Sequence, residues 1–109
     1  MVSIQPKKQD LIFRAIADPT RREILSLLRA RQQSVSEIAH NFSMSRPAIS
    51  KHLRLLRSAG LVVSRRKGRI SRCSLNANPL RAIDAWLRDY QTFWAQNLQG
   101  LKSYVEKTR

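Results

Sequence analysis

The stretch from Met44 to Arg69, MSRPAISKHLRLLRSAGLVVSRRKGR, constrains the fold of this chain more than any other. Ser45 is a typical N-cap, and Pro47 falls in the first turn of the helix that follows, where proline is tolerated. Apolar residues then recur at helical spacing, and Gly60 is the expected left-handed end of the helix. The inward stripe of this helix is predicted to consist of Ile49, Leu53 and Leu56, with Leu55 at its margin. The segment therefore predicts an amphipathic helix that has one buried face and one strongly basic face.

The residues on either side of this helix predict the rest of the fold. Two strand-like runs, 61–66 and 69–75, are joined at Lys67-Gly68, which reads as a hairpin turn. Three further helices are expected before the basic helix, over 10–17, from 19 to about 31 and from 35 to about 41, and a long helix is expected after residue 79. Asp18 is a good N-cap for the second helix, and Ser34 and Glu37 fit a capping box at the start of the third. The predicted order is α-α-α-α-β-β-α, a mainly α chain with a small β-hairpin (α+β). Two short helices followed at once by a basic hairpin predict a winged helix-turn-helix, with residues 1–109 forming a single domain.

The charge of the chain indicates a polyanionic partner. Its 109 residues carry 21 Lys plus Arg against 7 Asp plus Glu, a net charge of +14, and no acidic residue lies between Glu37 and Asp84. A long stretch whose charged residues are all basic is less often accidental than a stretch that mixes acidic and basic residues. No stretch approaches the roughly 20 apolar residues of a membrane span, and the N-terminus lacks a signal-peptide core. We therefore expect a soluble, cytoplasmic protein that binds nucleic acid rather than a membrane.

The basic helix and hairpin supply the candidate DNA contacts. In a helix-turn-helix the second helix enters the major groove with its N-terminal residues against the base edges. Arg46 suits guanine, Ser50 can bond to either base of a pair, and Ala48 can touch a thymine methyl group. For His52 the sequence leaves base contact and a packing or phosphate-bonding role equally open. The predicted DNA-binding residues are Ser45, Arg46, Ala48, Ser50, Lys51, His52 and Arg54 on the helix, and Arg65, Arg66, Lys67 and Arg69 at the tip of the hairpin.

Catalytic and metal-binding constellations are not apparent in the sequence. There is no phosphate-cradling glycine loop, no paired carboxylates within a segment and no nucleophile beside a base and an orienting acid. Cys73 is the single cysteine, which rules out an intrachain disulfide and a Cys-based zinc site within one chain. The expectation is a protein that is not an enzyme and that needs no metal or cofactor.

The last helix carries five of the seven aromatic residues, between Trp86 and Tyr104. Apolar residues recur there at intervals of three and four, and a small domain has already used its earlier stripes for its own core. A two-fold partner would cover this face and would place two basic helices about one DNA turn, roughly 34 Å, apart. Packing within its own domain is one alternative, and a small-molecule pocket lined by Trp86, Tyr90 and Trp94 is another.

Three motifs resemble the ArsR family of bacterial winged-helix repressors. They are ADPTRREIL at 17–25, MSRPAISKHL at 44–53 and LRSAGLV at 56–62, and the resemblance extends over nearly the whole chain. It implies a homodimeric transcriptional repressor of double-stranded DNA whose first and last helices form the dimer interface. The interface residues so implied are Leu11, Ile12, Ala15, Trp86, Tyr90, Phe93, Trp94, Leu98 and Leu101.

Metal-sensing members of this family carry cysteines on the helix before the basic helix, or His and Asp ligands on the last helix. Here the first place reads SVSEIAH, and the last helix offers Asp84 and Asp89 without a histidine. The chain is therefore similar to a metal-independent subgroup, and any small-molecule effector is left undefined. Two alternatives remain from other classes: a non-specific architectural DNA-binding protein, and a sensor that responds through Cys73 or through a ligand on the aromatic helix. An RNA-binding role is weakly supported, because the basic hairpin has no aromatic side chain to stack on bases.

Overall fold

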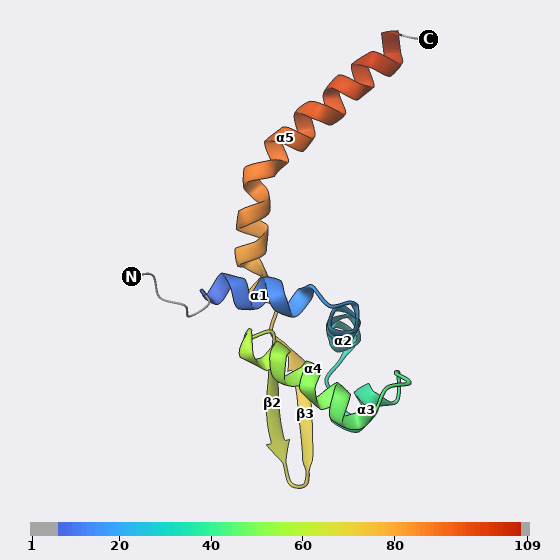
Figure 1. Ribbon diagram of the computed structural model, residues 1–109, viewed down its shortest axis with the longest axis vertical. Coiled ribbons are helices and arrows are strands. Elements are labelled where there is room, and N and C mark those ends of the chain that lie inside the picture. The colour runs from blue at the N-terminus through green and yellow to red at the C-terminus, as the bar shows by residue number, and fades with distance from the viewer. Residues whose placement is uncertain (1–6, 108–109) are drawn as a thin grey trace.

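A computed structural model describes residues 7–107, except the side chains of Gln99 and Ser103. It is mostly helical, with a small antiparallel sheet whose strand order is β1-β3-β2 (Figure 1). The elements are α1 (Lys8–Ile16), α2 (Pro19–Ala30), β1 (Gln33–Ser34), α3 (Val35–Ala39), α4 (Arg46–Ser58), β2 (Val62–Lys67), β3 (Ile70–Leu75) and α5 (Leu80–Lys107). The predicted fold class is confirmed. The two-residue strand β1 was not foreseen.

Three helices begin at the caps that the sequence indicates. The Asp18 carboxylate accepts a hydrogen bond from the backbone N–H of Arg21 at 3.0 Å, and Ser45 Oγ accepts from the N–H of Ala48 at 3.3 Å. Ser34 and Glu37 form a reciprocal capping box at the start of α3. These bonds satisfy amide groups that a helix leaves unpaired in its first turn, so each helix has a defined starting residue.

The core lies between the sheet and helices α1 to α4. Its buried members are Ile12, Ala15, Ile24, Leu28, Ile38, Ile49, Leu53, Leu56, Ala59, Leu61, Val62 and Cys73. The predicted inward stripe of α4 is confirmed, because its three residues are buried here. Ile12 and Ala15, two of the predicted interface residues of α1, are each 2% exposed within the single chain, where they pack into the protomer's own core. Leu11 is half-buried and packs against the core.

The hairpin turn lies one residue later than the sequence suggested. Lys67 pairs with Ile70 at the end of the ladder, so Gly68 and Arg69 form the two-residue loop. Gly68 has a φ of +65°, and the loop needs a glycine at this first position because side chains with a Cβ rarely adopt that conformation. β3 is the central strand and also pairs with β1, through Gln33 opposite Cys73 and Ser34 opposite Arg72.

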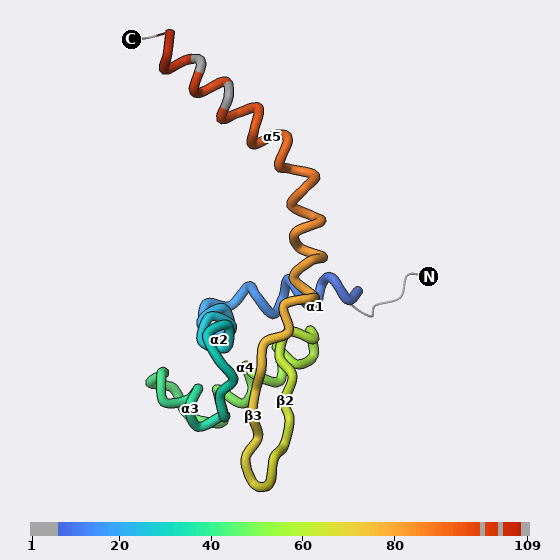
Figure 2. The backbone as a smooth tube through the Cα atoms, turned by 180° about the vertical axis from the view of Figure 1, so that it is seen from behind, coloured from blue at the N-terminus to red at the C-terminus, as the bar shows by residue number. Residues whose placement is uncertain are grey.

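Helix α5 begins beside the body of the protein and then leaves it. Its first part packs against α1, where the rings of Phe13 and Trp86 meet edge to face with centroids 5.2 Å apart. Beyond that contact α5 extends away from the other elements as a single long helix, as both views show (Figures 1 and 2). Within residues 7–107 no helix combines the length and the apolar character that a membrane crossing requires.

Candidate nucleic-acid interface

Helix α4 has one face anchored in the core and one face that is polar and accessible. Leu53, at 1% exposure, and Ile49, at 0%, hold the inner face. The predicted contact residues occupy the rest of the helix. Ser45, Arg46, Lys51 and Arg54 are exposed, and Ala48, Ser50 and His52 are half-buried. α3 precedes this helix, and residues 40–45 connect the two. This arrangement holds the polar residues rigidly at the surface, as a helix that reads a groove requires.

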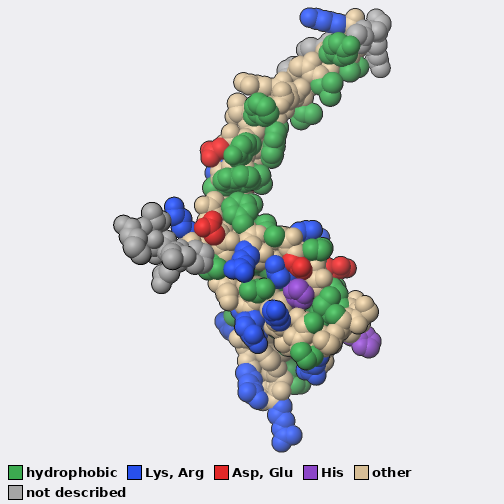
Figure 3. Space-filling model, viewed as in Figure 1, with side chains coloured by type: hydrophobic (Ala, Val, Ile, Leu, Met, Phe, Trp, Pro, Cys, Tyr) green, Lys and Arg blue, Asp and Glu red, His purple; other side chains and the backbone are tan. Residues whose placement is uncertain are grey.

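The basic residues of the hairpin are divided between its two faces. Successive side chains of a strand point to opposite sides of a sheet. Ser64 and its partner Cys73 face inward, so the next pair, Arg65 opposite Arg72, lies on the outer face, and Arg66 opposite Ser71 lies on the inner face again. All of these arginines are exposed, and Lys and Arg side chains extend to the end of the hairpin farthest from α5 (Figure 3). The hairpin is thus a wing with cations on both sides.

A groove joins the wing to the start of α4. It has a volume of about 340 Å³, and its basic lining residues are Arg46 from α4 and Arg69 from the wing loop. Three serines, Ser34, Ser36 and Ser71, add hydroxyl groups, and Val35 and Ile70 are the apolar part of the lining. Guanidinium and hydroxyl groups are hydrogen-bond donors, which suit the acceptor atoms that DNA offers at its base edges and phosphates. The sequence did not indicate that these serines share a groove with Arg46, because they come from three different elements that only the fold brings together.

Arg57, which the sequence places with Arg54 as a phosphate contact, and Arg72 both make side-chain contacts that the sequence did not reveal. The Arg57 guanidinium donates to Ser64 Oγ at 3.0 Å, so it braces the wing against α4 instead of pointing only to solvent. Arg72 lies 4.0 Å from the Glu37 carboxylate, which also pairs with Arg31 at 3.3 Å. The backbone N–H of Ser34 donates to that carboxylate and lowers its pKa, so Glu37 stays charged beside this part of the wing.

His52 lies on the side of α4 that faces the start of α2. Its Nδ1 is 3.2 Å from Arg21 Nη1 and 3.9 Å from the nearer Asp18 carboxylate oxygen. The imidazole side chain is 21% exposed. The structure therefore supports a packing role for the ring, one of the two alternatives that the sequence left open, with the side chain still partly exposed.

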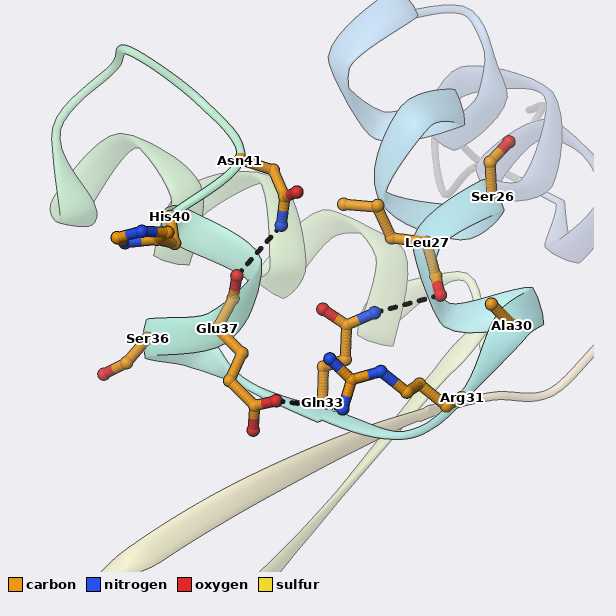
Figure 4. A pocket seen from close by; sticks show the side chains of 9 residues that line it. All are labelled: Ser26, Leu27, Ala30, Arg31, Gln33, Ser36, Glu37, His40 and Asn41. Carbon is orange, nitrogen blue, oxygen red and sulfur yellow. Dashed lines mark hydrogen bonds and ion pairs between the residues drawn. The ribbon is translucent and has the colours of Figure 1, made fainter.

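The remaining chemical groups are separate from this surface. Cys73 is fully buried, with its Sγ 3.6 Å from Ser64 Oγ. In the part of the chain that the structure describes, no three His, Cys, Asp or Glu side chains gather into a metal-binding group. A groove of about 630 Å³ lies between α2 and α3 (Figure 4), and neither α4 nor the wing contributes to its lining. Its amides bond locally: Gln33 Nε2 donates to Leu27 O and Asn41 Nδ2 to Glu37 O.

A core-anchored helix with a basic exposed face, preceded by a short helix and followed by a cationic wing, defines the class of winged helix-turn-helix DNA-binding proteins. Comparison with known proteins leads to the family. Residues 18–64 match the family described as "Bacterial regulatory protein, arsR family". The chain is 39% identical over 79 residues to the transcriptional repressor SdpR of Bacillus subtilis, covering 72% of this chain and 88% of SdpR. It is 33% identical over 100 residues to the HTH-type transcriptional regulator Rv2034 of Mycobacterium tuberculosis, covering 92% of this chain and 91% of the relative.

Solved structures agree with these relatives. The crystal structure of an ArsR family transcriptional regulator matches with a TM-score of 0.75 at 36% identity, covering 82% of this chain and 98% of that one. An ArsR-like transcriptional regulator from Rhodococcus sp. RHA1 matches with a TM-score of 0.68 at 34% identity, covering 89% and 92% of the two chains. The chain belongs to the ArsR family. It is a DNA-binding transcriptional regulator, and the resemblance noted in its motifs is confirmed.

Proposed function

We propose that this protein is a homodimeric repressor that binds a near-palindromic DNA operator. The observation that carries the proposal is the two-sided helix α4, whose buried stripe fixes a polar N-terminal face at the surface. Arg46 and Ser50 read base edges in the major groove, with Ala48 against a thymine methyl group. Lys51 and Arg54 contact phosphates and set the register of the helix on the duplex. SdpR is named a repressor, and we assign the same outcome to this chain.

The wing adds contacts beside the major groove. Arg66 on its inner face and Arg69 in its loop lie on the side of α4, and Arg69 shares a groove with Arg46. We assign to these two residues contacts with the DNA next to the bases that α4 reads. Arg65 and Lys67 occupy the outer face and meet the phosphate backbone from the other side. Arginine near a narrow minor groove gains from its negative potential, which explains the concentration of like charges at the tip.

The dimer is formed through the apolar face of α5, together with Leu11 of α1. Large apolar side chains of α5 are exposed in the single chain, including Phe93 at 61%, Leu98 at 67% and Leu101 at 60%. Trp86, Tyr90 and Trp94 continue the same face toward the body. Exposed apolar surface of this extent marks an interaction site, and a two-fold partner presents an identical stripe to cover it. The whole chain then acts as one DNA-binding unit with dimerisation helices at its two ends, in the cytoplasm where a bacterial regulator meets its DNA.

The test of base reading compares Arg46→Ala with Arg54→Ala on two duplexes. A preferred site is first selected by the wild-type protein from a pool of random DNA, and affinities are then measured for that site and for unrelated DNA at one salt concentration. Arg46→Ala should weaken the selected site by about 1–3 kcal/mol and relax the preference at one base position. Arg54→Ala should weaken both duplexes by similar factors. If Arg46→Ala also weakened both equally, Arg46 would be a phosphate contact and α4 would not read bases through it.

A further inference from the structure

Arg21 joins three helices through one side chain. Its Nε donates to the carbonyl oxygen of Ala15 at 2.8 Å, and its Nη2 donates to the carbonyl oxygen of Arg14 at 3.0 Å, both in the last turn of α1. Its Nη1 lies 3.2 Å from Nδ1 of His52 on α4. Arg21 itself stands in the first turn of α2, where its backbone N–H caps onto Asp18. Two hydrogen bonds to the end of α1, through Nε and Nη2, therefore fix the orientation of the guanidinium group, and this orientation places Nη1 beside the imidazole.

This contact determines which nitrogen of the imidazole carries the proton. An arginine guanidinium has five N–H donors and no acceptor, so His52 Nδ1 has to accept the hydrogen bond. In a neutral imidazole the proton then resides on Nε2. The Asp18 carboxylate favours the opposite tautomer, because a carboxylate near Nδ1 attracts an N–H donor there. At 3.9 Å its oxygen is too distant for a hydrogen bond, whereas Arg21 is within range.

We propose that Arg21 is a positioning residue for DNA recognition, which holds His52 as an Nε2–H donor to the phosphate backbone. The inference rests on the proposed function, since it assumes that the exposed edge of α4 meets DNA. A phosphodiester offers only acceptor oxygens, so the Nε2–H tautomer can bond to it and the Nδ1–H tautomer presents a lone pair that phosphate repels. The His52 side chain is 21% exposed, so it is partly accessible from the surface of α4, and Nε2 is the ring nitrogen that does not face Arg21. Arg21 thereby acts on DNA affinity through another residue and does not itself touch the duplex.

The first experiment observes the tautomer directly, without DNA. His40 and His52 are the only histidines of the chain, so long-range ¹H–¹⁵N correlation spectra resolve two imidazoles, and a His52→Gln spectrum assigns them. Spectra are recorded at mildly alkaline pH, where imidazole is neutral. In the wild type His52 should be in the Nε2–H form. In Arg21→Gln the Asp18 carboxylate should draw the proton to Nδ1, while the signals of His40 stay unchanged.

A matched control isolates the Arg21–His52 contact. Arg22 donates to the carbonyl oxygen of Ile16 at 2.8 Å, a similar tie between α2 and the end of α1 that does not involve the ring. Arg22→Gln should leave the tautomer of His52 as it is in the wild type. Circular dichroism establishes that each variant is folded, and Arg21→Lys supplies a second substitution that retains a donor. An Nδ1–H form in the wild type, or the same tautomer in wild type and Arg21→Gln, would overturn the proposal.

The second experiment measures DNA binding with two replacements of His52. A glutamine amide stands in for the Nε2 side of imidazole and an asparagine amide for the Nδ1 side. His52→Gln should therefore keep the phosphate donor and bind the selected site within about threefold of the wild type. His52→Asn should bind about tenfold more weakly, as expected for one lost hydrogen bond to a charged group. Arg21→Gln should resemble His52→Asn, and Arg22→Gln should resemble the wild type. Equal losses for the two His52 variants would contradict the donor role. A wild type without preference for any DNA site would instead refute the proposed function and leave the tautomer result to stand by itself.

Discussion

Phe93 gives the most quantitative prediction about the dimer. Its side chain is 61% exposed in the single chain, on the face of α5 that we assign to a partner. Burying a whole phenylalanine side chain stabilises by roughly 1.5–3 kcal/mol, so covering three fifths of it contributes about 1–2 kcal/mol in each protomer. Phe93 occurs twice in a two-fold dimer, and Phe93→Ala should therefore destabilise the dimer by about 2–4 kcal/mol. This corresponds to a rise of roughly thirty- to several-hundred-fold in the dimer dissociation constant.

Sedimentation equilibrium of the wild type and the variant over a range of protein concentrations measures that constant. Thr92→Ala is the matched control: Thr92 is exposed, and at roughly 100° per residue it lies outside the apolar stripe of α5, so the change should leave dimerisation unchanged. Phe93→Ala should keep its helical circular dichroism signal per chain under conditions where it dissociates. If Phe93→Ala and Thr92→Ala dimerised equally well, or if the wild type sedimented as a monomer at micromolar concentration, the assignment of this face to a second copy would be refuted.

Three further predictions concern stability and the thiol. Leu53→Ala removes a fully buried side chain and should lower the free energy of unfolding by about 2–5 kcal/mol in urea titrations, whereas Leu55→Ala, at a half-buried position, should cost less. The N–H of Arg21 lowers the pKa of Asp18 below its usual 3.8, so Asp18 stabilises the fold above that pH and the contribution is lost as pH falls through the lowered value. In Asp18→Asn, urea midpoints should accordingly depend less on pH in the acid range than they do in the wild type; equal slopes would contradict this. Cys73 is 0% exposed, so it should react with a thiol reagent only as fast as the protein opens. Oxidant should have the same effect on the DNA affinity of the wild type as on that of Cys73→Ser. If oxidant lowered the DNA affinity of the wild type alone, Cys73 would act as a thiol sensor.

The elements that the sequence predicted well are those with local signals. The caps at Asp18, Ser34 and Ser45 lie within three residues of the amides that they satisfy, and the stripe of α4 follows a helical period, so both can be read from neighbouring letters. β1 is two residues long and has no alternation to detect. The pattern places the turn one residue early, because it indicates that Gly68 is in the loop without showing which neighbouring residue ends the strand ladder.

Other features depend on contacts between distant segments. Periodicity shows that Ile12 and Ala15 share an apolar face of α1, but only the packing shows that the protomer's own core already buries them. Arg21 and His52 are 31 residues apart, and nothing local to either one indicates the bond between them. The groove that joins Arg46 to Arg69 is likewise assembled from separate elements. The net charge of the sequence is enough to indicate a polyanionic partner. The division of the wing's basic residues between two faces can be seen only from the pairing of the strands.

The central claim is that α4 and the wing recognise a particular DNA sequence. The most direct measurement is a titration of the wild-type protein, at one salt concentration, against the duplex selected from random DNA and against a scrambled duplex of the same length and composition. A sequence-reading regulator should bind the selected duplex about 10³- to 10⁷-fold more tightly. Equal affinity for the two duplexes, with the same steep dependence on salt, would contradict base reading and would make the protein a non-specific, architectural DNA-binding protein.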